Sequence, residues 1–224
     1  MDKKKIKAVL FDLDGTLIDS YDAYYIAWFN ILKQYGITLT KKEFYAAGGI
    51  AYQEMLKTML KEKYAQLQKQ NKIAGISDYL LKECMALMPE KSRPLPYAKD
   101  ILLMLKSKGI KISIVSATPK NIIELGIKML DAEKLIDFFI SNEDVDMQKP
   151  APDCYLMAKD KYGFSNNECI VVEDSPVGIK AGKNAEMKVI AVKGYFNRQL
   201  NVAKPDYIFD DLKQVGEKII TLSE

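Results

Sequence analysis

Short apolar runs that end in polar or turn-forming residues recur along the chain. The first run spans residues 8–11 and ends at Asp12, with Asp14 and Gly15 directly after it. Such runs are typical of strands buried on both faces, as in the centre of a parallel sheet. Similar runs predict further strands over residues 110–115, 138–141, 169–172, 188–192 and 207–209, the last of them a short edge strand.

The stretch between the first two runs has a helical pattern and no predicted strand. Apolar residues recur there at helical spacing from about residue 21 to residue 88. Thr40 followed by Glu43 predicts a capping box at one helix start, and we expect further helices over residues 54–67 and 78–88. Prolines at positions 89, 94 and 96 mark the end of this helical block.

Helices and strands alternate along the rest of the chain. Helical patterns cover residues 98–108, 121–129, 153–162, 177–184 and 212–220, each beside one of the predicted strands. This alternation predicts an α/β fold, a doubly wound (Rossmann-like) and mostly parallel sheet, with an inserted α-helical cap domain. We assign residues 1–17 and 92–224 to the core and residues 18–91 to the cap.

Composition narrows the class of protein. Hydrophobic residues make up 48% of the 224 and charged residues 28%, as in ordinary globular proteins. A net charge of +3 without a long basic stretch gives no support for nucleic-acid binding, and no apolar run is long enough to cross a membrane. The three cysteines lack metal-ligand spacing. We therefore expect a cytoplasmic protein with reduced thiols, either a monomer or a weak dimer.

The chain contains no histidine. Serine–histidine and cysteine–histidine catalysis, imidazole metal ligands and histidine general bases are therefore excluded. Carboxylates, lysines, hydroxyls and backbone amides must carry any chemistry. A divalent metal would be held by oxygen ligands, which favours Mg²⁺.

Polar residues follow several of the predicted strands. Asp12, Ser116 and the pair Glu173–Asp174 each end one, and Lys149 lies in the loop after another. Taken singly, each has an ordinary alternative as a turn residue, a helix cap or a solvated loop residue. Ligands of open α/β sheets bind outside the carboxyl ends of the strands, however, so we expect these side chains to meet at one edge.

Their chemistry suits a metal-assisted reaction of a phosphate ester. Asp12, Asp14 and Asp174 offer an all-oxygen pocket for Mg²⁺, with Glu173 near enough to contribute directly or through water. The positive charge of Lys149 would help to balance these carboxylates and a phosphate dianion. Asp12 could then attack phosphorus, while Asp14 protonates the leaving oxygen and later activates water.

These motifs together resemble the haloacid dehalogenase superfamily. The resemblance rests on DLDGT at 12–16, Ser116 at a strand end, Lys149 in KPAPD and Glu173–Asp174 in VVEDSPVGIKAG, and it covers nearly the whole chain. The branch it favours contains β-phosphoglucomutase and enzymes like phosphoglycolate phosphatase. The presence of Asp14 argues for phosphoryl transfer and against a dehalogenase, because a departing halide needs no proton and dehalogenases of this superfamily usually lack the second aspartate.

The resemblance implies a role for each motif residue. Asp12 would be the nucleophile and Asp14 the general acid and base, while Ser116 and Lys149 would bind phosphate and order the nucleophile. It also implies that Mg²⁺ is held by the Asp12 side chain, the main-chain oxygen of Asp14 and Asp174. Three further residues are predicted to contact the substrate: Ala117, Gly49 and Tyr24.

The expected function is a Mg²⁺-dependent phosphatase for a small phosphorylated metabolite, such as a sugar phosphate or similar monophosphate. A phosphomutase is the alternative, although Tyr24 occupies about the place where relatives of that branch often carry a histidine. The loop around Gly49 also lacks a nearby arginine for a second phosphate. A non-catalytic binding protein on the same scaffold is the third reading.

Overall fold

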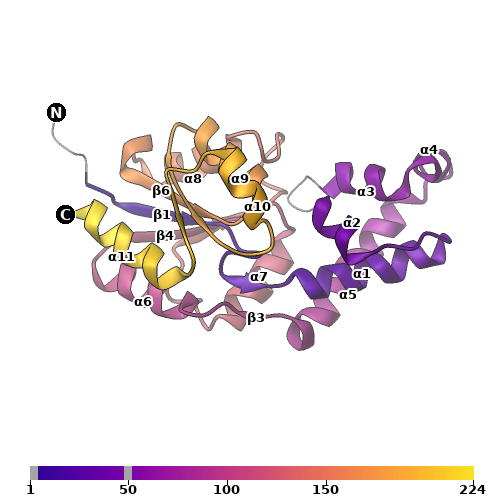
Figure 1. Cartoon of the computed structure of the whole chain (residues 1–224), viewed down its shortest axis with the longest axis horizontal. Helices are drawn as coiled ribbons and strands as arrows, with labels where there is room; N and C mark the ends of the chain where they lie inside the picture. The colour runs from indigo at the N-terminus through magenta and orange to yellow at the C-terminus, as the bar shows by residue number, and fades with distance from the viewer. Residues whose placement is uncertain (1–4, 48–51) are drawn as a thin grey trace. The chain divides into compact units, whose positions relative to one another are not determined.

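The computed structural model describes residues 5–47 and 52–224. The chain divides into two compact units, one formed by Met1–Asp19 with Pro94–Glu224 and the other by Ser20–Arg93. The larger unit contains a six-stranded sheet, and the smaller unit is helical. Figure 1 shows the sheet with the helices of the larger unit packed around it.

The six strands run parallel in the order β5-β4-β1-β6-β7-β8. Their bounds are β1 Ala8–Phe11, β4 Lys111–Val115, β5 Phe138–Ile140, β6 Cys169–Glu173, β7 Lys188–Val192 and β8 Tyr207–Phe209. From β1 the chain winds outward to β4 and β5, then crosses back and continues on the other side through β6. The winding therefore reverses at β1 and β6, where open α/β sheets bind their ligands.

Helices cover both faces of this sheet (Figure 1). On one face lie α8 Asp153–Tyr162, α9 Pro176–Asn184 and α10 Asn197–Ala203, and on the other α6 Ala98–Ser107, α7 Lys120–Met129 and α11 Leu212–Ser223. Alternate strand residues such as Val9 and Phe11 join the core cluster that includes Ile101 of α6 and Val215 of α11. All four residues of β1 are buried, as expected of a strand covered on both sides.

The smaller unit is built from five helices among its described residues: α1 Tyr21–Gln34, α2 Lys41–Ala46, α3 Tyr52–Leu60, α4 Glu62–Lys69 and α5 Ile73–Lys91. The predicted capping box at the start of α2 is present, with the Glu43 backbone N–H donating to the Thr40 side chain and the Glu43 side chain accepting from the Thr40 backbone. Two short strands, β2 Ile18–Asp19 and β3 Arg93–Pro94, pair where the chain passes between the units.

The predicted fold class is confirmed, because the mostly parallel sheet lies between helical layers and carries a helical insertion. Two predicted element boundaries were wrong. The helix expected over residues 54–67 is divided into α3 and α4 at Lys61, whose φ of 50° cannot continue a helix. The helix expected over residues 78–88 begins at Ile73 and includes Pro89 in its last turn.

Candidate active site at the carboxyl edge of the sheet

Asp12 and Asp14 lie where β1 ends and the chain turns. The Asp12 backbone N–H donates to Val172 O at 2.9 Å, which keeps this segment beside β6. Gly15 then adopts a φ of 84°, a conformation that suits glycine, and the turn closes where the Ile18 N–H donates to Leu13 O. The strand thus ends with a buried residue, Asp12, followed two positions later by Asp14, which is partly exposed as a residue.

Lys149 reaches this strand end although it is far away in the sequence. Its side chain is 6% exposed, and its ammonium group donates three hydrogen bonds: to Asp12 Oδ1 at 2.8 Å, Glu173 Oε1 at 2.7 Å and Val115 O at 2.9 Å. An ammonium group has three protons, so these partners use its full donor capacity. Burial alone would lower the pKa of Lys149, but the charges of Asp12 and Glu173 raise it well above the usual value.

Glu173 ends β6 with both carboxylate oxygens engaged. Oε1 accepts from Lys149 and from the Tyr155 hydroxyl at 2.8 Å, and Oε2 accepts from the backbone N–H and the hydroxyl of Ser175 at 3.2 and 3.0 Å. Ser175 also caps α9 by accepting from the Gly178 N–H. Gly178 gives the carboxylate its space, since a Cβ there would lie 1.6 Å from Glu173 Oε1.

Asp174 follows directly and is fully buried. Its Oδ1 accepts from the Thr16 hydroxyl at 3.5 Å, which ties the end of β6 to the turn after β1. Glycine occupies position 194 beside it, and a Cβ there would lie 3.7 Å from Asp174 Oδ2. The turn after β1 and the segment at Gly194 therefore both lie close to this carboxylate.

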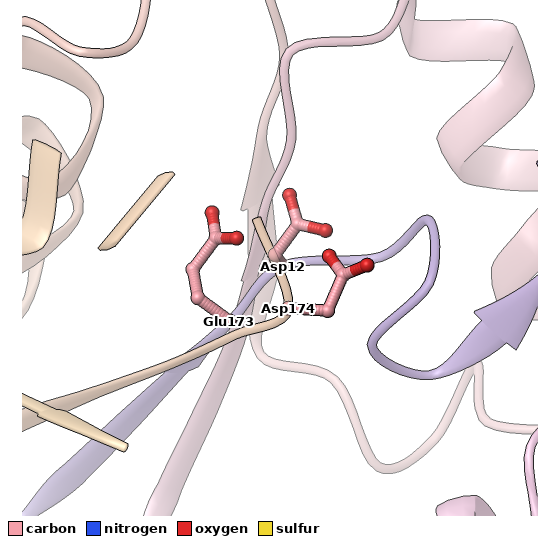
Figure 2. Close-up of side chains that lie close together, drawn as sticks. All are labelled: Asp12, Glu173 and Asp174. Carbon is pink, nitrogen blue, oxygen red and sulfur yellow. The ribbon is translucent and has the colours of Figure 1, made fainter. Parts of the chain in front are cut away.

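The carboxylates of Asp12, Glu173 and Asp174 gather at this edge (Figure 2). One oxygen from each lies within 4.8 Å of the others. Burial, then repulsion from Glu173, raises the pKa of Asp12 to about 8, even though Lys149 opposes the shift. The protein alone thus leaves excess negative charge among hard oxygen donors, and this fits a small divalent cation. Among the described residues, the Asp14 carboxylate is not part of this group.

Ser116 lies at the end of the neighbouring strand β4. Its backbone N–H donates to Ile140 O at 3.0 Å, and its hydroxyl is 2.9 Å from that of Thr118. The Thr118 N–H also donates to the Ser116 oxygen at 3.2 Å. Because Ser116 Oγ accepts this bond, its own proton remains able to donate. Ala117, also predicted to bind substrate, is the next residue and is partly exposed.

The structure brings the core residues predicted from the motifs to one edge of the sheet. Tyr24 belongs to the other compact unit, where it lies on α1 and is partly buried. Gly49 lies outside the described residues. The roles of Tyr24, Gly49 and Ala117 in substrate binding stay predictions.

Five further residues of the site are not among those predicted from the motifs: Tyr155, Ser175, Thr16, Thr118 and Gly178. Ser175 carried a usable signal, because serine before proline at a helix start is a common N-cap pattern. Tyr155 carried none, since its position on a helix predicts an ordinary core aromatic. Its hydroxyl partner comes from a strand that is 18 residues away in the sequence.

Comparison with known proteins identifies the family. A model described as haloacid dehalogenase-like hydrolase matches residues 9–192. The chain belongs to this family. It is a hydrolase of the haloacid dehalogenase type, and the predicted resemblance is confirmed.

Several known proteins are similar to this chain along most of their length. Hexitol phosphatase A of Escherichia coli is 31% identical over 84% of this chain and 83% of its own length. Phosphoglycolate phosphatase of Aquifex aeolicus is 29% identical over 90% and 91%. The solved β-phosphoglucomutase of Clostridium difficile superposes with a TM-score of 0.81 at 26% identity, covering 96% of this chain and 98% of its own.

The chain also aligns with a much longer plant protein. It is 28% identical to SUPPRESSOR OF QUENCHING 1 of Arabidopsis thaliana and spans about 20% of that protein's length. Within the described part of this chain, none of the helices is both long and apolar enough to cross a membrane.

Proposed function

We propose that the protein is a Mg²⁺-dependent phosphatase that hydrolyses a small phosphorylated metabolite through a phosphorylated Asp12. The observation that carries the proposal is the 2.8 Å contact between Lys149 and Asp12, with Asp174 in the same carboxylate group. Residues from three distant segments meet at the sheet edge where ligands bind in this class of fold. A hexitol phosphatase among the relatives supports a sugar phosphate as the substrate.

In this proposal Asp12 attacks the phosphorus atom and the bond to the ester oxygen breaks. Asp14 donates a proton to the departing oxygen, so that an alcohol leaves. In the second half-reaction Asp14 takes a proton from water, whose oxygen attacks the phosphorus and releases the Asp12 carboxylate with inorganic phosphate. Each step transfers one proton, and Asp14 returns to its starting state after one turnover.

Lys149 and Ser116 support this sequence. Lys149 holds Asp12 Oδ1 and balances charge in a buried setting, where electrostatic interactions are stronger than in water. The Ser116 hydroxyl and the backbone N–H of Ala117 are suited to hold phosphate oxygens. Asp12, the main-chain oxygen of Asp14 and Asp174 would hold Mg²⁺, which when bound offsets negative charge on the transferring group. Glu173 already accepts hydrogen bonds at both oxygens, which favours a role in holding Lys149.

The first test uses p-nitrophenyl phosphate and a panel of hexose phosphates, hexitol phosphates and phosphoglycolate, all with Mg²⁺. We expect turnover by the wild-type protein, loss under EDTA and recovery when Mg²⁺ is restored. Asp12→Asn should lose turnover by about 10³-fold or more, because an amide is not a competent nucleophile here. Asp210→Asn is the matched control at an exposed position and should retain full activity.

Phosphomutase activity is the second candidate. The likeness to the solved β-phosphoglucomutase favours it. Incubation with β-glucose 1-phosphate and a bisphosphate primer separates the two activities. An isomerised product without free phosphate would establish the mutase, while release of inorganic phosphate would establish the phosphatase.

A further inference from the structure

Tyr155 is a polar residue in the interior of the larger unit, and the proposed reaction gives it no role. It is fully buried in the first turn of α8, among the largest such side chains of the protein. A tyrosine hydroxyl is costly to bury without a partner, so a buried tyrosine usually has one. Here the partner is Glu173 Oε1, at 2.8 Å.

That oxygen is also the one that holds Lys149. Glu173 Oε1 accepts from Lys149 at 2.7 Å and from Tyr155 at 2.8 Å, so the two donors share one acceptor. The tyrosine ring approaches the same ammonium group, with Lys149 Nζ 5.0 Å from the ring centroid. Tyr155 thus contacts the lysine through its ring and holds the lysine's partner through its hydroxyl.

This arrangement constrains where Lys149 can direct its other protons. Ser175 holds the second oxygen of Glu173, and the carboxylate lies so close to Gly178 that a Cβ there would be 1.6 Å from Oε1. With Glu173 held at both oxygens, the two other hydrogen bonds of the lysine go to Val115 O and Asp12 Oδ1. Loss of the tyrosine hydroxyl would leave Glu173 Oε1 to Lys149 alone and draw the ammonium group away from Asp12.

We infer that Tyr155 is a positioning residue, which holds Glu173 and Lys149 so that Lys149 fixes the carboxylate of Asp12 for attack. The inference rests on the proposed function, because it assigns Asp12 as the nucleophile. It predicts an effect on the chemical step and little effect on substrate binding, because Tyr155 is placed to contact Glu173 and Lys149 and not the substrate.

The test compares Tyr155→Phe with Tyr162→Phe. Both substitutions remove one hydroxyl from α8, and each hydroxyl donates to a carboxylate. In the control, the Tyr162 hydroxyl donates to the Asp137 carboxylate at 3.2 Å. Asp137 lies before the amino end of β5, at the opposite edge of the sheet. We expect Tyr155→Phe to lower kcat roughly tenfold with KM changed less than about twofold, as for other supporting partners of a site. Tyr162→Phe should leave both constants unchanged.

A double-mutant cycle with Glu173→Gln tests the route. If Tyr155 acts through Glu173, the double variant should have a kcat within about twofold of that of Glu173→Gln alone. Independent, multiplicative losses would overturn the route through Glu173. A wild-type kcat in Tyr155→Phe, with only a lower melting temperature as in Tyr162→Phe, would overturn the positioning role itself.

An NMR measurement separates this inference from the proposed function. In protein labelled with ¹⁵N-lysine, the buried Lys149 ammonium should give a slowly exchanging signal, because all three protons are hydrogen-bonded. Tyr155→Phe should broaden or shift this signal, and Tyr162→Phe should not. If the wild-type protein hydrolyses no phosphate ester, the proposed function fails. An unchanged Lys149 signal in Tyr155→Phe rejects the positioning inference on its own.

Discussion

Asp12→Asn should stabilise the metal-free protein, although it should abolish activity. Three acidic side chains (Asp12, Glu173 and Asp174) lie together with Lys149, and the pKa of Asp12 is raised from 3.8 to about 8, first by burial and then by repulsion from Glu173. An acid whose pKa is raised on folding loses its contribution to stability as the pH rises from the unfolded value to the folded value. Asparagine cannot ionise and escapes this loss.

The size of the effect follows from the shift. Each pH unit between about 4 and 8 costs the wild-type protein at most roughly 1.4 kcal/mol relative to the variant. Relaxation and water entry reduce this, so we expect a gain of about 1–3 kcal/mol at pH 8 and clearly less at pH 5. For a chain of this size the gain at pH 8 corresponds to a melting temperature that is higher by about 3–10 °C.

Calorimetry of the wild-type protein, Asp12→Asn and the exposed control Asp210→Asn, all in EDTA at pH 5 and pH 8, measures this difference. Added Mg²⁺ should reduce the difference in melting temperature between the wild-type protein and Asp12→Asn at pH 8, because a cation that binds only the folded state stabilises the wild-type protein. A variant that is no more stable than the wild type at pH 8, or a gap equal at the two pH values, would refute the electrostatic reasoning.

Three further predictions concern two glycines, an ion pair and the metal site. Gly178→Ala should lower the free energy of unfolding in urea by about 3 kcal/mol, because the new Cβ would overlap the Glu173 carboxylate. Gly75→Ala, on α5 with open space around it, should instead raise the free energy of unfolding by about 0.5–1 kcal/mol. Equal stability of the two variants would contradict this reasoning. Glu168→Gln should lower the melting temperature at pH 7 but not at pH 2. Hydrogen bonds from Lys7 and Ser165 lower the pKa of Glu168 from 4.5 to about 2. The ionised carboxylate therefore stabilises the fold at neutral pH, and this stabilisation is lost as the pH falls from about 4.5 to about 2. A pH-independent difference would rule that out. Magnesium should raise the melting temperature of the wild-type protein and not that of Asp174→Asn, and equal shifts would show that the ion binds elsewhere.

The strands and their polar ends could be predicted from the sequence because each signal is local. The apolar run 188–192 coincides with β7, and Asp12 directly follows β1 as expected. Parallel strands meet at one edge, so a list of strand-terminal polar residues already defines the candidate site. The pairing of partners, such as Lys149 with Glu173, needed coordinates.

The errors have equally local causes. Nothing in the residues around Lys61 indicates a positive φ, so the helical pattern predicts one continuous helix across this position. Pro89 predicts the end of the helix, but it lies in the last turn of α5, where its missing N–H removes only one hydrogen bond near the helix end. No sequence signal identifies Tyr155 as part of the site, because its partner Glu173 lies on a different element and a buried tyrosine has the same spacing as any core aromatic.

Identification of the phosphorylated residue tests the central claim most directly. Wild-type protein is mixed with Mg²⁺ and its best phosphate ester, quenched in acid during turnover and reduced with borohydride, which converts an aspartyl phosphate to homoserine. Peptide mass spectrometry should then find homoserine at position 12 alone, and none in the Asp12→Asn variant. Steady turnover with an unmodified Asp12, or a label at any other residue, would contradict the account.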